Sequence, residues 1–178
     1  MPNYDFDKRA QIIGDRRKPY SIRISSLKGI TSNILHLLRE NKFPDFKYSL
    51  SVFFALASNP VEAAPLCEAV IVQGIQQIIR ANSLHHSLME KDDPNFVQTV
   101  RLMRKNIGEP DYILSRLLEI AENESNPEQL RKTALSSGTF IRSCFNNLCL
   151  NKAKEGYIQP EEIAERFVKL EHLTQALK

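Results

Sequence analysis

Apolar residues recur at helical spacing along most of the chain. Ile30, Ile34, Leu37 and Leu38 follow an i, i+4, i+7, i+8 pattern, which places all four on one face of a helix. Pro44 lies just beyond this pattern, so we expect the helix to end near residue 41. One amphipathic helix is therefore predicted from about residue 26.

Further helices are predicted by the same spacing, each closed by proline, glycine or asparagine. They cover about residues 45–58, 68–82, 94–106, 111–122, 127–135, 140–150 and 160–177, with a polar connector at 83–93. Tyr20–Ile24 alternates like a strand, but an isolated strand has nothing to pair with. The sequence therefore predicts an all-α fold.

The helix predicted at 68–82 has a mixed surface. Its aliphatic residues are expected to face inward and its glutamines and Arg80 to face solvent. The inward set is Val72, Ile75, Ile78 and Ile79, and the outward set is Gln73, Gln76, Gln77 and Arg80.

Charge distinguishes the N-terminus from the rest of the chain. The 178 residues carry a net charge of +3, while residues 1–28 alone hold seven basic and three acidic side chains. We expect residues 1–25 to form a basic arm, extended or partly helical, and 26–178 to form a single all-helical domain. Arg16, Arg17 and Lys18 in the arm could contact phosphate groups, and Ser21 could be a kinase site. The near-neutral remainder makes nucleic acid an unlikely partner.

Nothing in the sequence predicts a membrane span or a leader. No apolar run approaches the ~18–20 residues that cross a bilayer, and the first residues lack the apolar stretch of a secretory signal. A cytoplasmic location is the expectation, with export by a route that needs no signal peptide left open. Cys67, Cys144 and Cys149 lack metal-ligand spacing and are expected to be free thiols.

Candidate catalytic residues do not converge in the sequence. The histidines are His36, His85, His86 and His172, and His85 and His86 lie in a polar connector where no nearby cysteine or spaced carboxylate completes a metal site. Nucleotide-binding and hydrolase motifs are missing as well. We therefore expect a protein that is not an enzyme and that needs no cofactor or metal.

Three stretches share one order: an apolar helix, a polar break and a helix with one apolar face. The breaks at Pro60, Pro110 and Lys152 are 50 and 42 residues apart. Helical solenoids of the armadillo and HEAT types repeat every ~40–47 residues.

Two segments resemble a known family. Leu56–Pro60, followed by Leu66–Ala69 and Gly74–Ile79, is similar to the passage from the second to the third helix of an armadillo repeat. Asn147–Lys152 resembles the same corner again. The resemblance implies a short right-handed superhelical stack with about three degenerate repeats. An irregular helical bundle is the alternative.

The resemblance also implies a binding surface, because armadillo proteins hold extended peptides on the third helix of each unit. The matching residues here are Gln73, Gln77, Arg80, Arg116, Glu119, Arg166 and Lys169. The function expected from this surface is that of a non-catalytic protein–protein interaction module, a small scaffold or adaptor.

Other functional classes stay open. Glu161, Glu162, Glu165 and Glu171 give the C-terminus an acidic character like the export signals of some bacterial type IV effectors, so a secreted effector or secretion-system adaptor is the main alternative. The basic arm could bind an anionic membrane. A homo-oligomer that covers an apolar surface is a further possibility.

Overall fold

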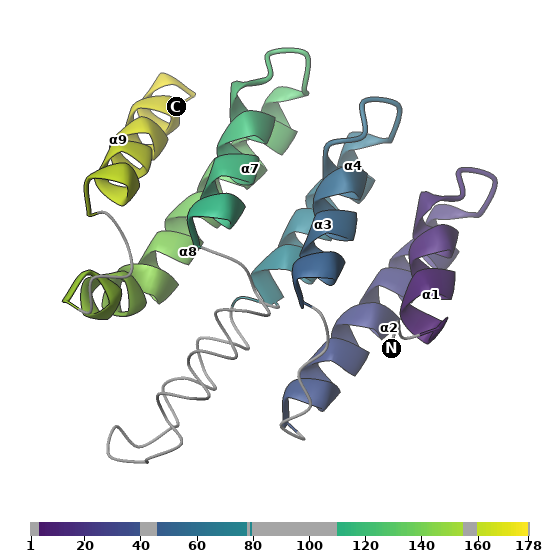
Figure 1. Ribbon diagram of the computed structural model, residues 1–178. Coiled ribbons are helices and arrows are strands. Elements are labelled where there is room, and N and C mark those ends of the chain that lie inside the picture. Colours follow the sequence, from purple (N-terminus) through teal and green to yellow (C-terminus); the bar gives the residue numbers. More distant parts are fainter. Residues whose placement is uncertain (1–3, 40–45, 78, 80–109, 155–159, 178) are drawn as a thin grey trace. The chain divides into compact units, whose positions relative to one another are not determined.

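The computed structural model describes residues 4–39, 46–77, 79, 110–154 and 160–177, and these residues form helices and turns without a strand (Figure 1). The prediction of an all-α fold is confirmed. The chain divides into two compact units, Met1–Gly108 and Glu109–Lys178, where the sequence suggested one domain after an arm.

The first helix pair of unit 1 includes the segment 1–25 that the charge pattern assigned to an arm. Helix α1 spans Tyr4–Gly14 and helix α2 spans Tyr20–Arg39. Phe6 and Ile13 on α1 are buried, as are Leu27 and Ile30 on α2. The segment expected to be an extended or partly helical arm is therefore helical over most of its described residues, and it contributes buried side chains. Its two buried α1 residues are seven positions apart among charged neighbours, which makes a stripe too sparse to predict a packed helix.

The second helix pair of unit 1 contains helix α3, Phe46–Ala57, which agrees with the helix predicted at 45–58. After a loop, helix α4 (Ala64–Ala69) continues into the π-helix η1 (Val70–Ile75). A Cβ added at Gly74 would lie 3.1 Å from ring atoms of Phe53 on α3. The absence of a side chain at Gly74 therefore allows η1 and α3 to approach closely.

The π-helix changes which residues face the core. In η1 the backbone N–H of Gln76 bonds to the carbonyl of Ile71, five residues earlier, so each turn holds more residues than an α-turn. Val72, expected inside, is 38% exposed, and Gln73, expected outside, is half-buried. Ile75 and Ile79 are buried as predicted, so the prediction was wrong for Val72, where it assumed 3.6 residues per turn throughout.

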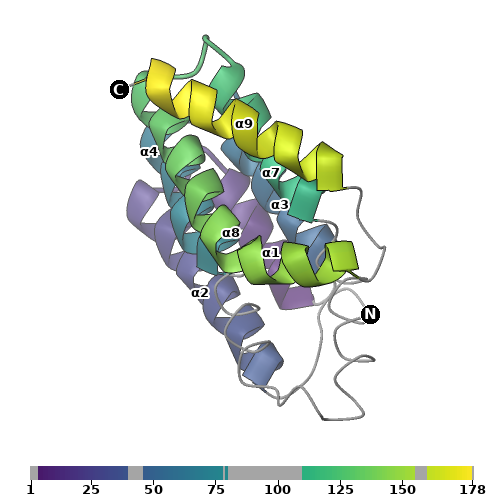
Figure 2. The ribbon, with the colours of Figure 1, turned by 90° about the vertical axis from the view of Figure 1, so that its left-hand side faces the viewer.

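Unit 2 consists of helices α7 (Pro110–Glu122), α8 (Glu128–Lys154) and α9 (Pro160–Ala176). Helix α9 packs against both α7 and α8 (Figure 2). The core of the unit is formed by aliphatic residues from all three helices. The main ones are Ile113, Leu114, Leu117, Leu118, Leu130, Leu135 and Leu170.

Helix α8 corrects two predictions. The sequence suggested separate helices at 127–135 and 140–150 and a break at Lys152, but α8 is continuous from Glu128 to Lys154. Gly138 lies within this helix and does not end it. A Cβ at this position would lie 2.8 Å from Leu170 Cδ1 of α9. The glycine therefore permits close packing of α8 against α9.

All three helix pairs, α1–α2, α3–α4 and α7–α8, turn through the same kind of corner. Each corner begins with an Asx residue: Asp15, Asn59 or Asn123. Its side-chain oxygen accepts a hydrogen bond from the backbone N–H two residues later, at 3.0, 3.2 and 3.1 Å. The backbone carbonyl of the same residue accepts a second bond from the N–H three residues later. Such Asx turns need one short polar side chain, so they can recur in sequences that otherwise differ.

A second contact joins the two helices behind each corner. The donor lies eight residues after the Asx residue and bonds to a carbonyl at the end of the first helix. Arg23 Nε donates to the Ile13 carbonyl (2.6 Å), Arg131 Nε to the Ala121 carbonyl (2.7 Å) and Cys67 Sγ to the Leu56 carbonyl (3.7 Å). These bonds satisfy carbonyls that a helix end leaves without an intrahelical partner.

Burial follows the same phase around the three corners. The residues nine positions before the Asx residue are Phe6, Leu50 and Leu114, and those two positions before it are Ile13, Ala57 and Ala121. The residues twelve positions after it are Leu27, Ile71 and Leu135. All nine side chains are buried. The three pairs are thus variants of one hairpin. Of the predicted breaks, Pro60 lies in a corner, whereas Pro110 begins α7 and Lys152 lies within α8.

Candidate functional site

A shallow groove lies beside α9 in unit 2. It has a volume of about 680 Å³, and its lining residues are Glu122, Ala164, Glu165, Val168, Lys169, His172 and Leu173. Val168 is 53% exposed and is one of the apolar side chains that line the groove. The groove therefore combines apolar side chains with a charged rim.

Ion pairs fix α9 in place around this groove. Lys169 Nζ lies 2.6 Å from Glu122 Oε1, which joins α9 to the end of α7. Arg142 on α8 pairs with Glu171, and its guanidinium carbon lies 4.9 Å from the centre of the Phe167 ring. A cation over an aromatic face adds electrostatic attraction to the packing. The wall that α9 provides is therefore tied to both of its neighbours.

The predicted partner-binding residues of unit 2 lie on two helices, α7 and α9. Lys169 lines the groove, and Arg166 on the same helix is half-buried. Arg116 and Glu119 pair with each other on α7, which is the first helix of its hairpin. A peptide-binding row along equivalent second helices would need them on α8. This part of the structure thus separates Arg116 and Glu119 from the position that the family resemblance implied.

The predicted residues of unit 1 lie on η1 or beyond it. Gln73 and Gln77 are half-buried, and Arg80 falls outside the described residues. The side-chain oxygen of Gln73 is buried and has no hydrogen-bond partner among the residues described, and the same holds for Nε of Arg116. Thr31 Oγ1 lies 2.9 Å from the Gln73 carbonyl, so α2 packs directly against this part of η1.

Arg16, Arg17 and Lys18, predicted in an arm, occupy the corner between α1 and α2. The Arg17 guanidinium binds both carboxylate oxygens of Asp15, at 2.9 and 3.2 Å. This pairing lowers the pKa of Asp15 from its ordinary value, chiefly through the side-chain hydrogen bond. The side chains of Arg16 and Arg17 are nevertheless 65% and 90% exposed.

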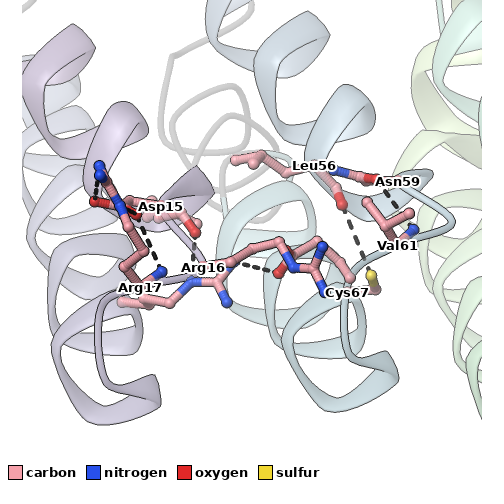
Figure 3. A network of polar contacts seen from close by, with 10 residues as sticks. Asp15, Arg16, Arg17, Leu56, Asn59, Val61 and Cys67 are labelled. Atoms are coloured by element: carbon pink, nitrogen blue, oxygen red, sulfur yellow. Dashed lines mark hydrogen bonds and ion pairs between the residues drawn. The ribbon is translucent and has the colours of Figure 1, made fainter.

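A carboxylate that the sequence did not single out organises this end of unit 1. Glu62, in the α3–α4 loop, has a side chain that is only 1% exposed, and it pairs with the buried Arg23 and with Arg16, 3.6 Å away. Figure 3 shows polar contacts in the two neighbouring corners, with Arg16 between Asp15 and Arg17 of the first corner and with Asn59 and Val61 in the second. Sequence alone could not reveal this network, because Glu62 and Arg23 are 39 residues apart.

Cys67 lies at the edge of the same network. Burial raises the pKa of its thiol, and the nearby Glu62 carboxylate raises it further. Cys67 is a free cysteine, as expected, while the side chains of Cys144 and Cys149 lie outside the described part. A thiol with a raised pKa is a weak nucleophile at neutral pH.

Metal-ligating residues do not gather anywhere in the part that the structure describes. His172 lies on the groove rim, His85 and His86 fall outside the described residues, and the side chain of His36 is not described. Among the described helices, none is long and apolar enough to cross a membrane.

Comparisons of this chain with protein-family models, with curated proteins and with solved structures gave no match.

Proposed function

We propose that this protein is a non-catalytic interaction module that binds a partner protein in the groove beside α9. The observation that carries the proposal is the groove itself, with Val168 exposed in it and Lys169, Glu165 and His172 around it. Protein-binding surfaces commonly combine an apolar centre with a polar rim.

The hairpin architecture supports this assignment. Three helix pairs share one corner and one burial phase, which is the pattern expected of degenerate helical repeats. Repeat proteins of this kind expose extended surfaces to partners, and the armadillo-like stack remains the arrangement that we propose.

The test is site-specific crosslinking in cells. A photo-reactive amino acid replaces Val168, and the crosslinked partner is identified by mass spectrometry and confirmed with the purified pair. Val168→Asp is then compared with Gln175→Asp, which adds the same charge to α9 at an exposed residue that does not line the groove.

We expect Val168→Asp to weaken binding of the purified partner by at least about tenfold, because a charge introduced at the apolar centre of an interface commonly costs more than ~1.4 kcal/mol of binding free energy. Gln175→Asp should bind as the wild type does. Equal binding by both variants, with unchanged thermal stability, would exclude the groove as the binding site.

A further inference from the structure

The corners α1–α2 and α3–α4 lie at the same end of the unit 1 helices (Figure 1). Two contacts between them fix their proximity: Arg16 with Glu62, and the Tyr20 hydroxyl, which lies 3.5 Å from the Pro65 carbonyl. The two loops therefore form one surface, which we call the basic corner and define by Arg16, Arg17, Lys18, Tyr20 and Val61.

In the basic corner, the carboxylates are shielded from solvent and the basic side chains are exposed. The carboxylate of Glu62 is 1% exposed and that of Asp15 is 22% exposed. The side chains of the arginines that they hold are 65% exposed for Arg16 and 90% exposed for Arg17 (Figure 3), and Lys18, the next residue in the chain, is exposed as well. The surface that the basic corner exposes to solvent is therefore mainly positively charged.

Apolar side chains stand among these charges. Val61 is 58% exposed and Tyr20 is 51% exposed. The backbone of Val61 is held by its hydrogen bond to Asn59, so the exposed side chain sits on an ordered turn.

The corner of unit 2 provides an internal comparison. It has the same Asx turn, yet Ser125 stands where the other corners have Arg17 and Val61, and Glu128 stands where Tyr20 stands in the first corner. Its loop also carries Glu124 and no basic residue. The turn therefore does not require basic or apolar residues, which makes their presence in unit 1 a property of that surface.

We infer that the basic corner docks the protein on a lipid bilayer that carries anionic headgroups. Basic side chains near such a surface are attracted to it, and tyrosine and aliphatic side chains at a loop tip enter the interfacial layer. Charge complementarity and the exposed Val61 together favour a bilayer over an acidic polypeptide, which would use the arginines and lysine but gain little from an aliphatic tip.

The experiment is co-sedimentation of the full chain with vesicles of phosphatidylcholine alone and with one third phosphatidylserine, at low and high salt. The test variant combines Lys18→Glu with Val61→Asp, because neither side chain takes part in the ion pairs that join the corners. The control combines Lys28→Glu with Val72→Asp, the same two kinds of substitution at exposed residues on α2 and η1 outside the corners.

We expect partitioning to the anionic vesicles to exceed that to neutral vesicles by about tenfold at low salt and to fall at high salt. The test variant should lose about tenfold in partitioning, and the control should change less than about twofold. Equal partitioning to both vesicle types, or a test variant that partitions like the wild type, would overturn the inference. So would tight binding of soluble poly-glutamate with no vesicle binding, because the ligand would then be an acidic chain.

Discussion

At the residue scale, the most consequential side chain is the carboxylate of Glu62. It is withdrawn from solvent and faces the Arg23 guanidinium, whose side chain is only 8% exposed. A buried charge that loses its partner is strongly destabilising, since nothing else compensates for its lost hydration.

We predict that Glu62→Ala lowers the free energy of unfolding by about 3–5 kcal/mol, measured by urea denaturation. The control is Glu128→Ala, which removes an exposed pair with Lys132 and should cost less than about 0.5 kcal/mol. Similar small losses for both variants would show that the Arg23–Glu62 pair contributes little.

Cys67 allows a pH-dependent prediction. Because burial and the Glu62 carboxylate raise the pKa of its thiol, the reactive thiolate forms at higher pH in the folded protein than in the unfolded chain. Alkylation of Cys67 by iodoacetamide, read by peptide mass spectrometry, should rise with pH along a curve displaced to higher pH than in urea. In Glu62→Gln the curve should move back toward lower pH. Coincident curves in buffer and urea would contradict the raised pKa.

At the scale of secondary-structure elements, the junction of α3 and η1 depends on one large and one absent side chain. Phe53 is fully buried, contacts the Phe6 ring at 6.2 Å between centroids, and fills the space that Gly74 leaves.

We predict that Phe53→Ala costs about 3–5 kcal/mol of unfolding free energy, because a cavity remains where the ring was. Val72→Ala, on the exposed side of η1, should cost less than about 0.5 kcal/mol. A loss below about 1 kcal/mol for Phe53→Ala would mean that the surrounding helices close the cavity.

The elements also show how far the sequence was informative. Helices α3, α7 and α9 could be predicted, because their apolar spacing is regular and proline or asparagine marks their ends. Helix α1 was missed because a stripe of Phe6 and Ile13 is weak beside so many charges. The two helices predicted at 127–150 are one, because Gly138 is used for packing and not for a turn.

Only part of the candidate site could be predicted from the sequence. Lys169 was singled out from its helix and does line the groove, but Glu122 belongs to another helix and Val168 looked like an ordinary helix residue. A groove forms where helices distant in sequence meet, which periodicity along one helix does not encode. The same holds for the basic corner, whose residues come from two loops that are far apart in the chain.

At the scale of the whole molecule, the division into two compact units predicts how stability is shared. Contacts are concentrated within Met1–Gly108 and within Glu109–Lys178. A core defect should therefore raise the opening rate mainly in the unit that contains it.

We predict that Phe53→Ala accelerates amide hydrogen exchange in peptides of α1–α4 and leaves α7–α9 nearly unchanged, measured by mass spectrometry. Leu117→Ala, which removes a buried side chain from α7, should produce the opposite distribution. Acceleration throughout the chain by both variants would show that the units unfold as one cooperative body.

The π-helix at Val70–Ile75 affects how related sequences should be aligned with this chain. A wider turn accommodates one residue more than a regular helix does over the same length, so a gene that lost a single codon there could keep the rest of that helix in phase. Elsewhere in a packed helix, the same deletion would rotate all later side chains by about 100°. Alignments between hairpins of this protein, or with distant homologues, should therefore permit a one-residue gap within 70–75 and penalise gaps in the flanking turns.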